Sequence, residues 1–139
     1  MSRLTAADAP VGTELPAQVF HVTRADLVRY AGASGDFNPI HWSERIATSV
    51  GLPGVIAHGM YTLALAGNAV VEWAGGPDRV LSFGARFTKP VVVPDDDTGT
   101  VVTVAGTVKS VEDGVATIDL TVTNADQKVL GMSKATVRV

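Results

Sequence analysis

Hydrophobic and polar residues alternate along the second half of the chain with the two-residue period that is typical of half-buried strands. One alternating run covers residues 102–109 and another covers residues 117–122. Asp113-Gly114, between these runs, is a strong signal for a tight hairpin turn. Asn124–Gln127 predicts another turn before a last strand over Lys128–Val139. We therefore expect an antiparallel meander with one buried face.

The segment from Gly59 to Ala74 has a different pattern, because it leaves almost no polar face when it is placed on a helix. About sixteen residues of helix would be roughly 24 Å long, and Gly75-Gly76-Pro77 ends it. A helix that is apolar nearly all round belongs in the interior. A sheet that wraps around this helix would bury both apolar surfaces, which predicts an α+β fold.

The first third of the chain predicts shorter elements. Leu15–Val22 has the pattern of a short strand. Thr23 then has the position of a helix N-cap, with Asp26 three residues later in a capping-box arrangement. That helix should fail at Gly32–Gly35, and a second short helix is expected over Glu44–Val50.

Composition bounds the class of protein. The 139 residues are predicted to form one domain, and 46% hydrophobic against 18% charged residues argues against intrinsic disorder. A net charge of -3 without a Lys/Arg cluster argues against nucleic-acid binding. Met1–Pro10 lacks the apolar core of a secretory signal, and Val55–Val71 is too short and too polar for a membrane span. We expect a cytoplasmic protein.

Common catalytic and cofactor motifs are missing from the sequence. Cysteine is absent, which excludes thiolate nucleophiles and Cys-ligated zinc. The three histidines, His21, His41 and His58, do not stand at HxxxH or HExxH spacing. Nor does the chain contain a GxSxG elbow, a Walker A loop or a GxGxxG loop. We therefore expect neither a metal nor a cofactor.

Asp36 and His41 are the strongest candidates for acid–base chemistry. Five residues apart, they would point about 140° apart on a helix and lie roughly 16 Å apart on a strand. They can meet only if the chain folds back, which Gly35 and Pro39 permit. Such a pair can serve as acid and base near neutral pH. A purely structural Asx turn at Asp36 remains an alternative.

Gly59 is a second candidate, because it is placed at the start of the predicted interior helix. The first N–H groups of a helix lack internal partners and carry the positive end of the dipole. A thioester carbonyl aimed there would find an oxyanion site. The alternative is that Gly59 only relieves crowding and that His58 is a core residue.

These residues resemble a known family. Residues 30–41, Tyr-Ala-Gly-Ala-Ser-Gly-Asp-Phe-Asn-Pro-Ile-His, resemble the hydratase-2 motif of the MaoC-like (R)-specific enoyl-CoA hydratases and (3R)-hydroxyacyl-ACP dehydratases. Residues 57–60, Ala-His-Gly-Met, resemble the second signature of that family. The resemblance implies a hot-dog fold, in which an antiparallel sheet wraps around a long central helix. It covers essentially the whole chain.

The resemblance also implies an activity, the reversible hydration of a trans-2-enoyl thioester to the (3R)-hydroxyacyl thioester. Asp36 and His41 would be the catalytic dyad, and the Gly59 N–H would bind the thioester oxygen. Asn38 and His58 would support the site. Gly67 stands where some hydratases of the family carry a serine, which suggests room for a longer acyl chain.

The implied substrate is an acyl-CoA or acyl-carrier-protein thioester, in fatty-acid elongation. The implied partner is a second hot-dog subunit, either another copy or a related non-catalytic chain. A hot-dog thioesterase is one alternative function, and a non-catalytic acyl-binding subunit of a dehydratase heterodimer is another. The presence of both Asp36 and His41 argues against the non-catalytic subunit.

Overall fold

The computed structural model describes residues 9–139, and within them the chain forms one sheet, three α-helices and two short 3-10 helices. Residues 1–8, which carry most of the expectation about a secretory signal, lie outside the described part. The strands are β1 (Glu14–Val22), β2 (Val80–Phe87), β3 (Thr100–Glu112), β4 (Val115–Asn124) and β5 (Gln127–Arg138). The helices are α1 (Arg24–Ser34), η1 (Pro39–His41), α2 (Glu44–Ser49), α3 (Gly59–Ala74) and η2 (Pro77–Arg79).

The five strands pair in the order β1-β3-β4-β5-β2, and every pair is antiparallel. The two hairpins turn at Asp113-Gly114 and at Ala125-Asp126, and all four of these residues have a positive φ. Two central residues of positive φ give a turn whose twist matches that of the strands. Both turns and the meander are confirmed where the sequence predicts them.

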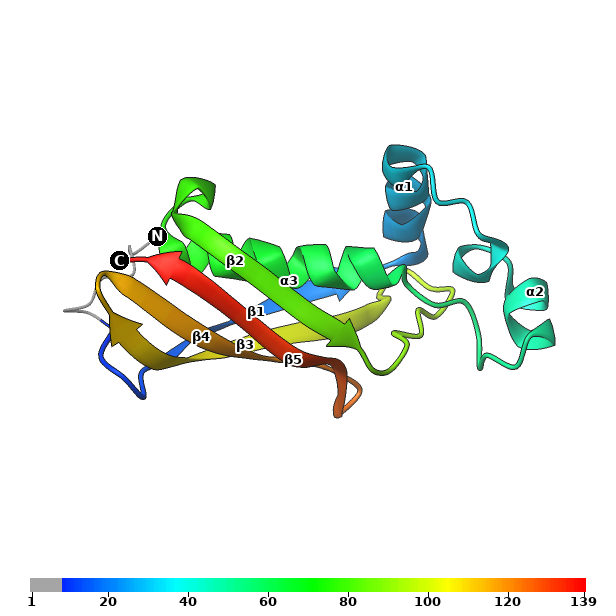
Figure 1. The fold of residues 1–139 in the computed structure, drawn as a ribbon. Helices are drawn as coiled ribbons and strands as arrows, with labels where there is room; N and C mark the ends of the chain where they lie inside the picture. Colours follow the sequence, from blue (N-terminus) through cyan, green and yellow to red (C-terminus); the bar gives the residue numbers. More distant parts are fainter. Residues whose placement is uncertain (1–8) are drawn as a thin grey trace.

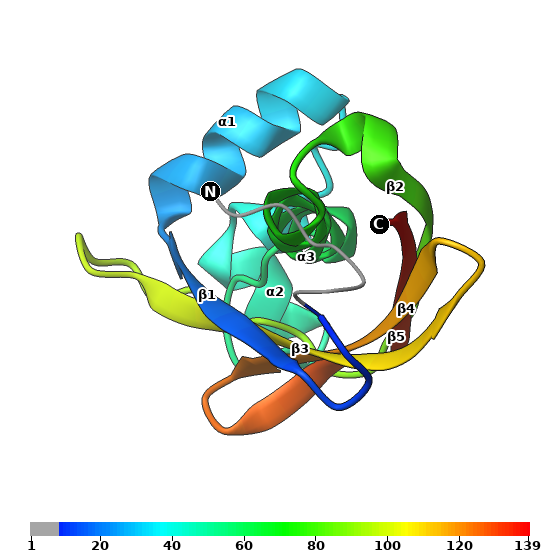
Figure 2. The ribbon, with the colours of Figure 1, turned by 90° about the vertical axis from the view of Figure 1, so that its left-hand side faces the viewer.

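The sheet curves around α3, and together they enclose the core (Figures 1 and 2). Side chains of one face of the meander are fully buried, because alternate residues of a strand point to the same face. These residues include Val102, Val104, Val108, Ile118, Val122, Ala135 and Val137. The predicted wrapping of a sheet around a sixteen-residue helix is confirmed.

Trp73 fixes the C-terminal part of α3 against the sheet. Its ring is buried, and its Nε1 donates a hydrogen bond of 2.8 Å to the carbonyl oxygen of Pro16. The ring lies over Gly106 of β3, where a Cβ would come within 2.8 Å of it. Gly106 therefore leaves the space that Trp73 occupies.

One row of α3 remains outside the core, which corrects the expectation of burial nearly all round. Met60, Ala64 and Asn68 are exposed and lie four residues apart, so they share one side of the helix. The sheet covers only part of the helix circumference (Figure 2). Asn68 therefore does not have to find its hydrogen bonds within the core.

Residues 23–58 form a separate helical layer around and beyond the N-terminal end of α3 (Figure 1). Thr23 caps α1, and the capping box with Asp26 is confirmed. The Arg24 guanidinium donates to Glu44 Oε2 of α2 and to the carbonyl oxygen of Val93, both at 2.6 Å. Its hydrogen bond to Glu44 lowers the pKa of that carboxyl. Polar side chains thus fix the geometry of the layer, while Leu27, Ala47 and Val55 join it to the hydrophobic core.

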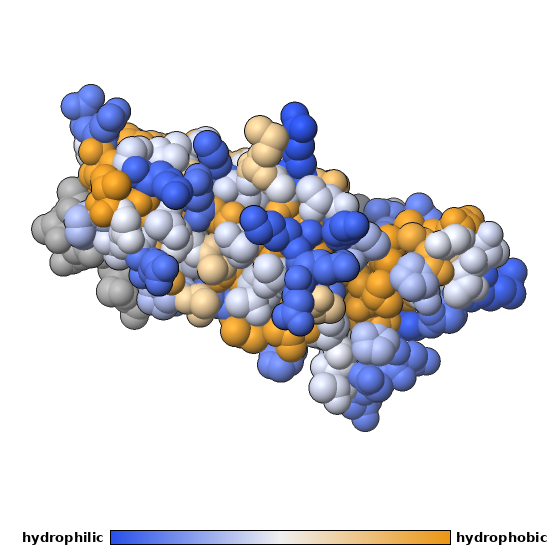
Figure 3. All heavy atoms as spheres, turned by 90° about the horizontal axis from the view of Figure 1, so that it is seen from below, coloured by the Kyte–Doolittle hydropathy of each residue, from blue (hydrophilic) through white to orange (hydrophobic). Residues whose placement is uncertain are grey.

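The outer face of the sheet is largely hydrophilic, and the largest hydrophobic area of this view lies toward α2 (Figure 3). Throughout residues 9–139, no helix combines the length and the hydropathy that crossing a membrane requires.

Candidate active site

The loop between α1 and η1 brings Asp36 and His41 together. Gly35 ends α1 in the left-handed region, at φ 78°, which turns the chain sharply. Asp36 Oδ1 then accepts from the backbone N–H of Asn38, and Asn38 Oδ1 accepts from the N–H of Ile40. These two turns fold the chain back, so that Asp36 Oδ2 lies 3.9 Å from His41 Nε2. The two side chains lie close together, as expected. Asn38 stabilises the loop, because its Oδ1 accepts the hydrogen bond from Ile40.

Hydrogen bonding defines the tautomer of His41. The ring is buried, and its Nδ1 lies 2.7 Å from the carbonyl oxygen of Ile56. A carbonyl oxygen only accepts, so Nδ1 carries the proton of the neutral ring. Nε2 therefore presents a lone pair toward Asp36, whose side chain is about half exposed. This is the arrangement of a base that can take a proton from a water molecule.

His58 is the N-cap residue of α3 and is 1% exposed. Its Nε2 donates to the backbone carbonyl oxygen of Asp36 at 3.1 Å. Its ring stacks on that of His41, with centroids 3.8 Å apart and planes at 22°. Tyr30 meets the His58 ring edge-on at 4.8 Å. Burial lowers the pKa of His58, and its Nδ1 has no hydrogen-bond partner among the described residues.

Gly59 begins α3, as the sequence predicts. Its N–H lacks an acceptor within residues 9–139, because the intrahelical bonds start at Tyr61 and no side chain caps the helix. The ring of Phe87 lies against this residue, and a Cβ on Gly59 would approach three ring carbons at 3.1–3.2 Å. The glycine thus leaves the space that the Phe87 ring occupies, next to a backbone N–H without a partner in the described part of the chain.

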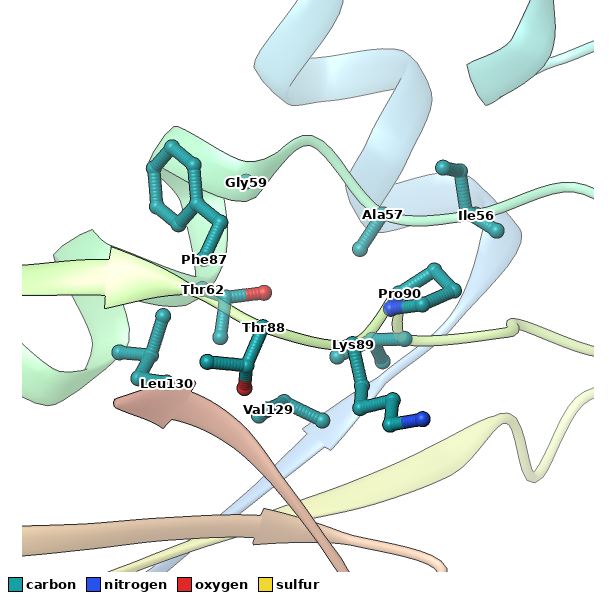
Figure 4. Close-up of a pocket in the computed structure, with 11 residues that line it drawn as sticks. Ile56, Ala57, Gly59, Thr62, Phe87, Thr88, Lys89, Pro90, Val129 and Leu130 are labelled. Carbon is teal, nitrogen blue, oxygen red and sulfur yellow. The ribbon is translucent and has the colours of Figure 1, made fainter.

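A cavity of about 240 Å³ opens beside Gly59 (Figure 4). Mostly apolar side chains line it, with Lys89, Thr62 and Thr88 as the polar ones. Asp36 and His41 are not among its lining residues. Residues 56–59 separate the two: Ile56, Ala57 and Gly59 border the cavity, whereas the Ile56 carbonyl and the His58 ring contact the dyad.

Gly67 packs beside strand β2. The ring of Phe83 from β2 lies beside it, and a Cβ there would be 3.5 Å from that ring. Gly67 does not line the cavity beside Gly59, so the hypothesis that it gives room for a longer acyl chain stays a prediction.

The arrangement of Asp36, His41 and His58 is poorly suited to a metal ion, although one ligand atom of each lies within 4.8 Å of the others. The two rings are stacked with nearly parallel planes, so their in-plane lone pairs do not converge on one point. One nitrogen of each ring is also bound to a backbone carbonyl.

Two contributors to the site were missed by sequence reasoning. The Ile56 carbonyl sets the tautomer of His41 across 15 residues, and Tyr30 packs on His58 from α1. A carbonyl group has no residue signature, so no sequence pattern could reveal the first. The second was within reach, since Tyr30 lies inside the motif that carries Asp36 and His41.

The fold agrees with the folds of known proteins. The family model described as "MaoC like domain" matches residues 5–127. A 3-hydroxyacyl-thioester dehydratase X of Mycobacterium tuberculosis is 48% identical over 79 residues, which are 57% of this chain and 27% of that protein. A solved MaoC-like dehydratase is 37% identical with a TM-score of 0.92, over 96% of this chain and 42% of the other.

The solved R-hydratase PhaJ1 of Pseudomonas aeruginosa is 26% identical with a TM-score of 0.83, over 99% of this chain and 86% of its own. The class of fold is therefore the hot-dog fold, as the resemblance implied. The chain belongs to the MaoC-like domain family. It spans about a quarter to a third of the length of the curated dehydratase relatives that it matches.

Proposed function

We propose that this protein is a hydro-lyase that interconverts trans-2-enoyl and (3R)-hydroxyacyl thioesters in fatty-acid metabolism. The observation that carries the proposal is the pairing of Asp36 Oδ2 with His41 Nε2 at 3.9 Å, with His41 Nδ1 bound to the Ile56 carbonyl. That distance is too long for a direct hydrogen bond and suits a water molecule that donates to both atoms. The dehydratase and hydratase names of the relatives support the same chemistry.

In the hydration direction, the water oxygen forms a bond to C3 of the enoyl group while one water proton passes to the dyad. The electrons of the C2–C3 double bond move toward C1, so the C1 oxygen becomes an enolate oxygen. C2 then takes a proton from the dyad, which completes the addition of water. Asp36 and His41 share these two transfers as a coupled pair. Dehydration is the reverse sequence.

The Gly59 N–H stabilises the enolate in this proposal. It is the first donor of a sixteen-residue helix, so the helix dipole adds to its positive potential. One such donor typically contributes about 3 kcal/mol to transition-state stabilisation. Asn38 maintains the loop through its Oδ1 and need not touch the substrate.

A hot-dog acyl thioesterase is the alternative enzyme, since it would bind the same class of substrate. A dyad of a carboxylate and an imidazole on a water molecule could also direct that water at C1. The dehydratase and hydratase names of the relatives favour hydration at C3. The alternative of a non-catalytic acyl-binding subunit is disfavoured because both residues of the dyad are in place.

A thioester of coenzyme A or of an acyl-carrier protein is the proposed substrate, and the cytoplasm is the proposed compartment. We further propose a dimer with a second hot-dog subunit, either another copy or a related non-catalytic chain. Strand β2 lies at one edge of the sheet and carries the exposed side chains of Leu81 and Phe87. An open edge beside apolar residues favours pairing with another chain.

Hydration of crotonyl-CoA by the purified chain tests the proposal. We expect loss of absorbance of the conjugated thioester and formation of the (3R) product. His41→Ala and Asp36→Asn should each lower kcat/KM by about 10² or more, because acid–base groups typically contribute that much. Release of free coenzyme A without hydration would favour the thioesterase. If both variants retained hydration activity, the assignment of Asp36 and His41 as the catalytic dyad would be refuted.

A further inference from the structure

His58 contacts both members of the dyad at once. Its Nε2–H is bound to the backbone carbonyl of Asp36, and its ring is stacked on His41. Asp36 lies 22 residues before His58, so this hydrogen bond ties the loop to the start of α3. Among the residues that the structure describes, no other side chain has both contacts.

We propose that His58 is a positioning residue, which holds the Asp36 backbone and the His41 ring in the relative placement that the dyad chemistry requires. This inference rests on the proposed function. His58 does not touch the reacting atoms in this assignment, because its Nε2 is committed to a carbonyl and its ring face to His41.

The burial of His58 argues against an inert packing role. An imidazole nitrogen that is buried without a partner costs free energy, and His58 Nδ1 has none within residues 9–139. An apolar side chain of similar volume would avoid that cost. Unlike an apolar side chain, the imidazole donates a hydrogen bond to the Asp36 carbonyl and also provides a flat face that stacks on His41.

The surroundings of His58 favour a neutral ring over a charged one. The titratable groups that face His58 are Asp36 and His41 from the loop and η1, and Tyr30 from α1, with Tyr61 packed behind Tyr30. Burial keeps the pKa of His58 below its ordinary value, and the neighbouring His41 acts in the same direction. A neutral His58 can therefore stack on His41 while His41 gains and loses its proton.

Two substitutions separate the two contacts. His58→Gln keeps an N–H donor at the reach of Nε2 and removes the aromatic face, whereas His58→Phe keeps the face and removes the donor. We expect His58→Phe to lower kcat about 10²-fold, since small misplacements of catalytic groups have effects of that size. His58→Gln should stay within about fivefold of the wild type, and KM should change little in both variants. The exposed His21 supplies the matched control His21→Gln.

Equal losses in His58→Gln and His58→Phe, or a loss confined to KM, would overturn the positioning role. A second measurement does not depend on turnover. Histidine side-chain NMR of the wild type should show His58 as the Nε2–H tautomer, with a pKa below the ordinary value of 6.5. In His58→Gln, which loses the stacked face, the His41 resonances should broaden or shift, and in His58→Phe, which keeps that face, they should change less while the backbone resonances of the Asp36 loop shift.

The outcomes distinguish this inference from the proposed function. A wild type that does not hydrate enoyl thioesters but shows the expected His58 tautomer and the expected His41 changes refutes the function and keeps the positioning role. If the wild type is active but the His41 resonances are unchanged in both His58 variants, only the positioning role is refuted.

Discussion

The wrapped core and the helical layer of residues 23–58 are built by different interactions. In the core, the sheet encloses α3 with side chains that are fully buried and apolar, such as Ile118 and Val122. In the layer, side-chain hydrogen bonds define the shape: Thr23 with Asp26, and Arg24 with Glu44. The core therefore derives its stability from burial, and the layer derives its geometry from directional polar contacts. The proposed chemistry is located where the two regions meet.

The largest separation between the two regions should come from Ile118→Ala in the core. Ile118 is 0% exposed, and removing its side-chain atoms leaves a cavity that a packed interior fills only in part. We expect the free energy of unfolding to fall by about 2–5 kcal/mol, measured by urea denaturation. Ile118→Val should cost about 0.5–1.5 kcal/mol.

Asp36→Asn in the layer should have the reverse effect, with an unfolding free energy near that of the wild type and a large loss of turnover. Its side chain is about half exposed, so its removal exposes little apolar surface. If the folded Ile118→Ala variant lost as much turnover as Asp36→Asn, the assignment of stability to the core and of chemistry to the layer would be contradicted.

Gly106→Ala should have a smaller effect within the core. The new Cβ would meet the Trp73 ring at 2.8 Å, and the hydrogen bond from Trp73 to Pro16 limits how far the ring can retreat. Overpacking of this kind typically costs about 1–3 kcal/mol, to be measured as a loss of unfolding free energy. Gly84→Ala is the control, because a Cβ there meets nothing within 4 Å, and it should stay within about 0.5 kcal/mol. Equal effects at both glycines would contradict the argument.

The smallest expected effect is a pH dependence of stability that originates in the layer. Burial holds the pKa of His58 below its ordinary 6.5, so the unfolded chain binds this proton more readily than the folded one. The contribution is fully present above the unfolded pKa and is lost as the pH falls through 6.5 toward the lower folded value. His58→Gln should show a shallower decline of unfolding free energy between about pH 7 and pH 5 than His21→Gln. A decline equally steep in both would show that His58 does not carry it.

The elements of the core were predictable because their signals are local and repeated. Neighbouring residues alone indicate three features: the period of two in β3 and β4, the Asp113-Gly114 turn, and the limits of α3. The exposed row of α3 was not predictable, since how far a sheet wraps around a helix depends on strand twist and pairing across the whole sheet. An apolar helix alone does not reveal which of its sides remains uncovered.

The candidate site was predictable only in part. Gly35, Asn38 and Pro39 indicated a loop that folds back, and that loop is present. The contacts of His41 with the Ile56 carbonyl and of His58 with the Asp36 carbonyl were not, because backbone groups carry no residue identity. The resemblance to a family identified the residues, and the structure supplied their tautomers and mutual placement.

The segment 56–59 presents its two sides to different tasks: one borders the cavity and the other contacts Asp36 and His41 through His58 and the Ile56 carbonyl. For protein engineering, this partition means that the lining of the cavity and the contacts of the dyad can be changed separately. Replacing Val129, Leu130 or Thr88 would reshape the cavity without touching any group that orients the dyad.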